Sequence, residues 1–361
     1  MSGVRDHLWD HPWDHPWLGA LFGDAEAGAI WSAEAELARL LAVEAAWSRS
    51  LGEAGLVEPE AAEAAARAVE AARPDPGGLA RGAARDGVVV PALVRQLRAA
   101  AGPHAGAVHR GATSQDILDT AQAMAIRDTG ALLLRRLEAL EAALGAIEAR
   151  WGAAALLGRT RMQAAEPTRA ATRIAAWAAP LARHRARLLA LRPRVEVVQA
   201  GGAVGDAAAL GLAAPAVAAE LARRLGLGAP ERSWHAQRDG LAEWGGALSL
   251  VSGSLGKMGQ DVCLMAQQGI DAVALSGGGG SSAMPHKSNP VLAELLVTLA
   301  RLNAARTAAL HGALVHEQER SGAAWMLEWA VLPPMAITAA RSLSAALDLV
   351  GQIERVGEAP G

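Results

Sequence analysis

The most constraining feature of this chain is residues 113–150, where large aliphatic side chains recur at alternating spacings of four and three. This spacing places one apolar seam along an α-helix, because it follows the period of helices that pack side by side in a bundle. A helix of this length cannot bury its seam alone, so we predict a fold built from several long helices. The seam residues are Leu133, Leu137, Leu140, Leu144 and Ile147.

The remaining sequence supports an all-α fold, because no period-2 strand pattern of any length is present. An acidic helical pattern over 30–72 ends at a Pro/Gly break over 73–78. We therefore predict an N-terminal helical domain over 1–108 and a long-helix bundle domain over 109–361. Further long helices are expected at 168–198, 206–225, 236–270, 290–317 and 335–356, joined by loops such as 157–167 and 276–290.

The charge balance argues against partners that attract through a uniform field. The chain has 34 basic and 37 acidic residues, a net charge of -3, so we expect neither nucleic acid nor membrane as a partner. The longest stretch without a charged residue, 272–286, is shorter than the roughly 20 residues of a membrane-spanning helix. The N-terminus has acids and histidines where a secretory signal would be basic and apolar, which favours a cytoplasmic protein.

Residues 6–17 form an internal repeat of three Asp-His-x-Trp tetrads. Their histidines, His7, His11 and His15, leave a metal-capturing role open. The prolines within the repeat argue against that role because they prevent the helix that would align the histidines, so an aromatic arm is favoured. Cys263 is the single cysteine, which excludes an intrachain disulfide and a multi-cysteine metal site. We expect no metal and no cofactor.

A Gly/Ser-rich stretch at 276–282 precedes Lys287, Asn289 and Pro290. Proline suits the first position of a helix, so Lys287 and Asn289 are expected beside the free amides of a helix N-terminus, where an anion is favoured. Without further information, a Gly-rich linker before a capped helix is the more common interpretation. A nucleotide-binding loop is not supported, because Gly201–Gly205 follows no strand pattern and no GxxxxGK[ST] sequence occurs.

Residues 280–289 read GSSAMPHKSN and match all seven specified positions of GSSxMPxKxN, the signature of the aspartase/fumarase superfamily. The chain therefore resembles this superfamily, which includes adenylosuccinate lyase, argininosuccinate lyase and bacterial 3-carboxy-cis,cis-muconate cycloisomerase. The resemblance implies catalytic roles for Ser281 and Lys287. It also implies substrate-binding roles for Ser282, Met284 and Asn289.

Residues 109–120, HRGATSQDILDT, are similar to the superfamily segment HxGxTSxDxxDT. There the Thr-Ser pair holds a substrate carboxylate, so the resemblance implies that Thr113 and Ser114 bind substrate and that His109 contacts it. Thr113 and Asp116 also have the spacing of a capping pair that opens a helix. Both interpretations can hold together, because a helix cap and an anion site use the same free N–H groups.

Residues 158–163, GRTRMQ, resemble the superfamily segment GRTHxQ, which implies that Arg161 and Gln163 bind substrate. Arg161 stands where lyases of the superfamily have the histidine that serves as general acid. An arginine, with a pKa above about 12, cannot deliver a proton at neutral pH. Elimination of hydroxide or an amine benefits from such an acid, whereas a carboxylate, with a pKa of about 4, adds and leaves without one. The departure favours lactone formation, although a surface arginine is the plainer alternative.

Two further segments resemble the cycloisomerase branch of the superfamily, WHAQRD at 234–239 and HEQERS at 316–321. They imply substrate-binding roles for Gln237 and Arg320, while a solvated face would equally explain polar residues there. The resemblance further implies an aspartase/fumarase-like bundle of long helices that assembles as a homotetramer with composite active sites. The usual C-terminal domain is expected to be absent, since the sequence ends about 70 residues after Asn289.

The resemblance and Arg161 together predict an intramolecular lyase that interconverts 3-carboxy-cis,cis-muconate, a small tricarboxylate, and 4-carboxymuconolactone in protocatechuate degradation. Ser281 would donate the proton during lactone formation and remove it in reverse. Two alternatives remain open: an adenylosuccinate-lyase-like C–N lyase that releases fumarate, and a catalytically silent helical scaffold.

Overall fold

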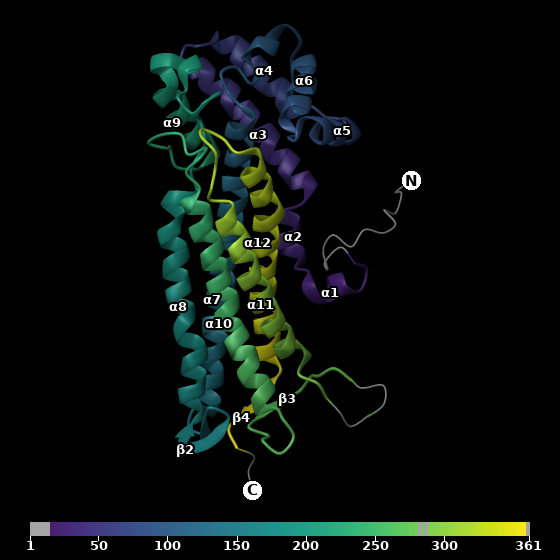
Figure 1. The fold of residues 1–361 in the computed structure, drawn as a ribbon, viewed down its shortest axis with the longest axis vertical. Helices are drawn as coiled ribbons and strands as arrows, with labels where there is room; N and C mark the ends of the chain where they lie inside the picture. The colour runs from purple at the N-terminus through teal and green to yellow at the C-terminus, as the bar shows by residue number, and fades with distance from the viewer. Residues whose placement is uncertain (1–14, 281–283, 285–287, 359–361) are drawn as a thin grey trace.

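The structure is a computed structural model that describes residues 15–280, 284 and 288–358. In these ranges the chain forms twelve α-helices and two small two-stranded sheets, which confirms the all-α class. The five longest helices of the bundle run along the long axis of the molecule (Figure 1). They are α7 (Ser114–Trp151), α8 (Ala170–Val195), α10 (Asp239–Met265), α11 (Val291–Gly312) and α12 (Gly322–Gly351).

The seam of α7 lies in the bundle core, as its spacing predicts. The side chains of Leu133, Leu137, Leu140 and Leu144 are completely buried against the other long helices, and Ile147 is partly buried. With a rise of about 1.5 Å per residue, the 38 residues of α7 span about 57 Å. The helix thereby links an upper end of the molecule, where it begins, to a lower end, where it finishes (Figure 1).

Helix α12 begins earlier than the predicted 335–356, because it continues through Pro333 and Pro334. Proline removes one hydrogen bond from a helix interior, but burial among α7, α10 and α11 outweighs that local cost. By length and composition this helix alone among the described residues would suffice to cross a membrane. Its most apolar window is 72% buried inside the protein, so it is a core helix.

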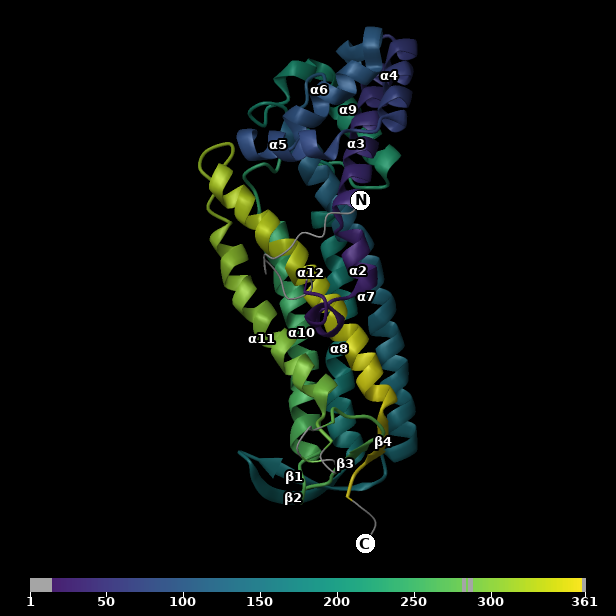
Figure 2. The ribbon, with the colours of Figure 1, turned by 90° about the vertical axis from the view of Figure 1, so that its right-hand side faces the viewer.

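Short helices gather at the upper end of the bundle (Figures 1 and 2). The predicted break at 73–78 is partly wrong, because Asp75 caps a helix there by accepting hydrogen bonds from the N–H groups of Gly77 (3.0 Å) and Gly78 (2.7 Å). Helices α1 and α2 lie along the side of the bundle. The short elements are α1 (Leu18–Phe22), α2 (Ala25–Ile30), α3 (Ala33–Glu53), α4 (Pro59–Ala71), α5 (Pro76–Asp86), α6 (Val90–Ala101), η2 (Gly102–Ala107), η3 (Ala208–Ala213) and α9 (Ala214–Leu225).

The lower end carries strands that the sequence pattern did not predict. Strand β1 (Ala155–Thr160) pairs antiparallel with β2 (Gln163–Arg169), where a loop over 157–167 was expected. Because most of this hairpin is exposed, its residues need not alternate between apolar and polar, and the period-2 signal is missing. A second pair, β3 (Val273–Leu275) and β4 (Ile353–Val356), joins the chain after α10 to the chain after α12.

His184 on α8 makes the stability of the bundle depend on pH. Burial, with the nearby Arg187 and Arg183, lowers the pKa of His184 from 6.5 to about 4. Its Nδ1 atom accepts a hydrogen bond from Arg187 (2.9 Å), and its Nε2 atom contacts the Ser254 hydroxyl (2.8 Å), so the folded protein holds the neutral ring.

Below pH 6.5 the unfolded chain therefore binds a proton that the folded chain does not. We expect this residue to remove about 1.4 kcal/mol of stability per pH unit as the pH falls from 6.5 towards 4. His184→Gln keeps a donor and an acceptor but cannot titrate, so the difference between wild type and variant should shrink with acid in urea titrations. Parallel stability curves would contradict this assignment.

Candidate active site

The predicted site residues lie at opposite ends of the bundle. His109, Thr113, Ser114, Gln237 and Arg320 are at the upper end, near the start of α7. Arg161, Gln163, Met284 and Asn289 are at the lower end, on the β1–β2 hairpin and the loop before α11. Ser281, Ser282 and Lys287 lie outside the described residues. One chain therefore does not bring the two groups together.

The upper group is built on the first turn of α7. Thr113 is the N-cap, and its backbone N–H donates to the Asp116 carboxylate (2.9 Å), which confirms the predicted capping pair. Ser114 is the first helical residue and is partly exposed. Free amides and the helix dipole at such a terminus favour an anionic ligand. The Thr113-Ser114 pair thus lies where a carboxylate would be stabilised.

Asp116 also fixes the chain segment after α8. Its Oδ1 atom accepts from Gly201 N–H (2.7 Å) and contacts His235 Nε2 (3.0 Å), while Oδ2 accepts from Gly202 N–H (3.0 Å). A Cβ atom on Gly201 would come within 2.4 Å of the Ser233 hydroxyl, so glycine is needed for this close approach. The Gly201-Gly202 pair therefore serves packing around Asp116.

Arg320 joins this end from the loop before α12. Its Nε atom donates to Gln115 Oε1 (2.8 Å), and its Nη2 atom donates to the Ala203 carbonyl (3.1 Å). Gln115 is completely buried beside Ser114, and its Nε2 atom donates to the His235 carbonyl (3.0 Å). Gln237 is exposed, and its side-chain amide donates to the Ser233 carbonyl (3.3 Å). Arg320 thus presents a cation next to the start of α7.

His109 is held by a buried carboxylate from α3. Its Nδ1 atom lies 2.7 Å from Oε1 of Glu44, whose side chain is completely shielded from solvent. His109 also has φ +60°, a left-handed conformation that costs a non-glycine residue about 1 kcal/mol or more. The contact with Glu44 fixes the orientation of the imidazole beside the Thr113-Ser114 pair.

An ion cluster lies beneath these residues in the core. Arg238 donates to Asp119 (2.6 Å) and Glu328 (2.8 Å), and all three side chains are 1% exposed. Burial alone would lower the pKa of Arg238, but the two carboxylates raise it above its ordinary value. Trp325, a buried tryptophan of α12, donates to Asp119 (3.1 Å) and belongs to the same cluster. The cluster ties α7, α10 and α12 together directly below the upper group.

The lower group is led by the tip of the β1–β2 hairpin. Arg161 and Met162 form its two-residue turn with φ values of +47° and +67°. Hairpins of this length favour positive φ at both turn positions, where Asn-Gly is the usual pair. Bulky residues in this conformation store strain, and such strain is concentrated at functional positions. The Met162 side chain is 72% exposed, so the tip is presented to solvent in the single chain.

Cations surround a cavity of about 540 Å³ beneath this hairpin. Arg159, Arg161, Arg173 and Lys257 line it, together with the carboxylate of Asp261. Lys257 and Arg173 both pair with Asp261, which leaves the two hairpin arginines without an ion pair among the described residues. The hairpin therefore has the charge to attract an anionic substrate.

The loop before α11 is partly described. Asn289 exchanges two backbone hydrogen bonds with Gly279, which closes the base of the loop. Pro290, predicted as the first helical residue, is instead the N-cap of α11, so the helix begins one residue later, at Val291. Met284 is 42% exposed. In the described ranges, no three His, Cys, Asp or Glu side chains are grouped to hold a metal ion.

The buried partners of the site were not identified from the sequence. Glu44, Gln115, Asp119 and Glu328 each contact a site residue or its support, but each partner is distant in sequence. Gln115 and Asp119 do lie within the HRGATSQDILDT segment. In that segment, however, the resemblance implies substrate contacts only for His109 and the Thr-Ser pair.

Comparison with known proteins finds similar sequences and similar folds. The chain is 40% identical to the 3-carboxy-cis,cis-muconate cycloisomerase of Pseudomonas aeruginosa, over 93% of this chain and 74% of that protein. The crystal structure of 3-carboxy-cis,cis-muconate lactonizing enzyme from Pseudomonas putida superposes with a TM-score of 0.89 at 36% identity, covering 94% of this chain and 77% of that one. A fumarate lyase from Mesorhizobium sp. BNC1 gives a TM-score of 0.87 at 34% identity, covering 93% and 76%.

Residues 25–302 match the protein family described as Lyase. The matched range includes the HRGATSQDILDT, GRTRMQ and GSSAMPHKSN segments. The chain therefore belongs to this lyase family.

Proposed function

We propose that this protein is a cycloisomerase that interconverts 3-carboxy-cis,cis-muconate and 4-carboxymuconolactone. The observation that carries the proposal is Arg161, a fixed cation at the strained hairpin tip in place of a titratable acid. Relatives named for this reaction, at 40% and 36% identity, support it. The corresponding place in metabolism is the protocatechuate branch of aromatic degradation, in a cytoplasmic enzyme.

The reaction requires one proton transfer and one C–O bond. In lactone formation, a substrate carboxylate oxygen adds to the diene, and a proton is delivered to the carbon next to another carboxylate. That carbon passes through an enediolate, whose extra negative charge cations and N–H donors stabilise. Arg161, Arg320 and the first turn of α7 supply such groups, Gln163 and Asn289 supply amides, and Ser281 with Lys287 would handle the proton.

The two halves of the site would meet between chains. Along α7 they are about 57 Å apart, so a composite site needs a second copy with its lower end beside the upper end of the first. Small residues on the exposed side of the bundle would allow close approach of helices from another copy. They include Ala175, Ala179, Ala182 and Ala186 on α8, Gly253 on α10, and Ala304, Ala305 and Ala308 on α11. This geometry calls for at least one further copy, and we infer a homotetramer because the resemblance to the superfamily implies that assembly.

The direct test is to mix the purified protein with 3-carboxy-cis,cis-muconate and follow loss of the diene absorbance in the ultraviolet. Decay of the absorbance is expected. Fumarate release from adenylosuccinate without diene loss would instead favour the C–N lyase alternative. Inertness towards both substrates would favour a helical scaffold.

Arg161→Ala should lower kcat/KM by about 10²-fold, because one donor to a developing oxyanion is lost. Arg161 is exposed at the hairpin tip, so the thermal transition should stay within about 1 °C of wild type. Steady-state assays and thermal unfolding measure the two effects. Arg67→Ala, an exposed arginine of the upper end, is the matched control. Equal activity of both variants would remove Arg161 from the reaction.

Mixing two inactive variants tests the composite site. Ser114→Ala damages the upper group and Arg161→Ala damages the lower group, so co-refolded chains should contain some sites with neither change. We expect the mixture to recover up to about a quarter of wild-type activity, as random chain mixing predicts. No recovery after verified subunit exchange would contradict a site shared between chains.

A further inference from the structure

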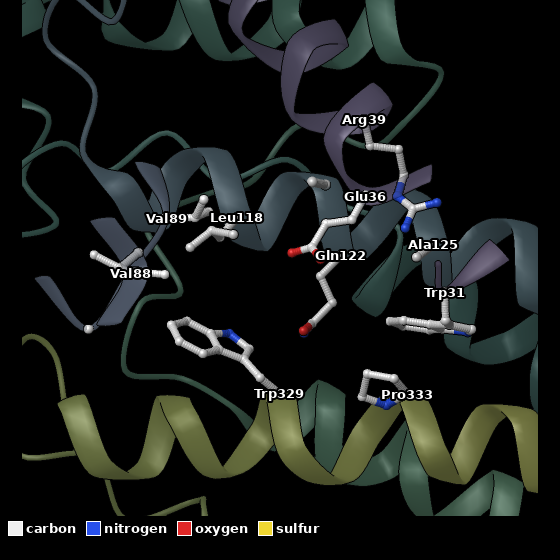
Figure 3. Close-up of a pocket in the computed structure, with 13 residues that line it drawn as sticks. Trp31, Glu36, Arg39, Val88, Val89, Leu118, Gln122, Ala125, Trp329 and Pro333 are labelled. Carbon is white, nitrogen blue, oxygen red and sulfur yellow. The ribbon is translucent and has the colours of Figure 1, made fainter. Parts of the chain in front are cut away.

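A second cavity, of about 330 Å³, lies between the upper short helices and the bundle. Four segments line it: Trp31–Arg39 around the start of α3, Ala83–Val89 between α5 and α6, Leu118–Ala125 of α7, and Trp329–Pro333 of α12. Figure 3 shows their side chains converging on one space. Its volume falls within the usual range of small-molecule pockets. None of the predicted site residues lines this cavity.

The walls of the cavity suit a flat apolar ring. Trp31 and Trp329 stand at opposite sides of the space, with Val88, Val89 and Leu118 completing its apolar surface (Figure 3). Contacts with neighbouring residues hold both indoles in place. Trp31 Nε1 donates to the Thr129 hydroxyl (3.0 Å). Trp329 packs edge-on against Trp325, with 4.6 Å between the ring centroids. Fixed aromatic walls favour stacked or edge-on contact with another aromatic ring.

Two hydrogen-bond donors at this cavity have no partner among the described residues. The Nε atom of Arg39 and the Nε2 atom of Gln122 are shielded from solvent, and no described residue accepts a hydrogen bond from either. Burying an unpartnered donor costs free energy, so such atoms point to an acceptor that the chain itself does not provide. The Gln122 amide and the Glu36 carboxylate both project into the space (Figure 3).

The cavity is lined by one cation, Arg39, and one anion, Glu36, so its unpartnered donors rather than its net charge favour an anionic ligand. Burial lowers the pKa of Arg39, and the carboxylates of Asp128 and Glu36 offset only part of that effect. A carboxylate can accept from both free donors at once, whereas an organic cation would leave them unpaired.

We propose that this cavity binds a single-ring aromatic monocarboxylate. Its two carboxylate oxygens accept hydrogen bonds from Arg39 Nε and Gln122 Nε2, and its ring lies between Trp31 and Trp329. A hydroxyl on the ring has Glu36 as its partner. The site is separate from the proposed catalytic groups, and the proposal does not depend on the reaction that the enzyme catalyses.

The experiment is isothermal titration of the full-length protein with benzoate, 4-hydroxybenzoate and benzylamine. We expect benzoate to bind once per chain with a dissociation constant below about 1 mM, a modest affinity for a ligand of this size. The hydroxylated ring should bind more tightly, and benzylamine should not bind. Arg39→Gln and Gln122→Leu should each weaken benzoate at least tenfold, whereas Arg67→Gln, an exposed change in the same region, should not.

Arg161→Ala separates this cavity from the catalytic groups, which also attract carboxylates. Benzoate binding should survive Arg161→Ala and be lost in Gln122→Leu, and Trp329→Phe should reduce the accompanying change in tryptophan fluorescence. Loss of binding in Arg161→Ala alone would place benzoate in the catalytic site and overturn the proposal. Preference for benzylamine, or no binding of any probe to variants and wild type that fold normally, would overturn it as well.

Discussion

Ser281→Ala is expected to lower kcat by about 10³-fold, within the range lost when a positioned acid or base is removed. In the proposed reaction, this hydroxyl carries the proton that reaches the carbon beside a substrate carboxylate. A hydroxyl is a weak base, so the reverse reaction depends on nearby cations such as Lys287 to stabilise the alkoxide. Because the change removes a single oxygen, the folded assembly should persist. Stopped-flow absorbance of the diene and light scattering measure the two outcomes.

Ser276→Ala is the matched control for this prediction. Ser276 lies on the same Gly/Ser-rich segment, but its hydroxyl donates to the Gln352 carbonyl (3.3 Å) at the base of the loop. We expect near-normal turnover in that variant. Full activity of Ser281→Ala would remove this serine from the mechanism, and the proton would then have to come from another group.

Arg238→Ala should destabilise the protein by about 3–5 kcal/mol, the usual result of removing one partner from a buried ion cluster. The change leaves Asp119 and Glu328 facing each other at 1% exposure without their shared cation. It also removes the ion pairs that tie the start of α10 to α7 and α12. Urea denaturation, with the fitted slope checked for two-state behaviour, measures the loss.

Arg194→Ala provides the comparison, because Arg194 forms an ion pair of similar length with Glu243 (2.7 Å) at about half exposure. Exposed pairs contribute at most about 1 kcal/mol, so this variant should remain close to wild type. If both variants lost the same stability, burial of the Arg238 cluster would not be the cause of its contribution.

The sequence predicted some elements of the fold correctly and missed others. The seam of α7 was evident because every residue that forms it lies on one helix, within about four turns. The predicted start of α12 at 335 was wrong, because the helix continues through Pro333 and Pro334, where tertiary packing outweighs the local cost of proline. The β1–β2 hairpin was missed because an exposed hairpin needs no apolar alternation. Local sequence patterns therefore predicted the long helices of the bundle, but neither the start of α12 nor the β1–β2 hairpin.

In the site, too, contacts between sequence neighbours could be predicted, whereas contacts between residues far apart in the sequence could not. The spacing of Thr113 and Asp116 predicts a capping pair, and the structure has the hydrogen bond from the Thr113 N–H to the Asp116 carboxylate. Glu44 and His109 are 65 positions apart, and Asp119 and Arg238 are 119 apart, so no local pattern connects them. The roles of Gln163 and Asn289 remain predictions, since the single chain does not bring them to the upper group. The roles of Ser281 and Lys287 remain predictions as well, because these residues lie outside the described ranges.

The hairpin tip has a consequence for attempts to make this enzyme more robust. Glycine at Met162 would relax a backbone that now holds a bulky residue at φ +67°. A screen for thermal tolerance would therefore reward flexible or small residues there, while selection for turnover would keep Arg161 rigidly aimed. A substitution at this turn is therefore expected to raise thermal stability while lowering turnover. Variants selected only for thermal stability are expected to have a lower kcat.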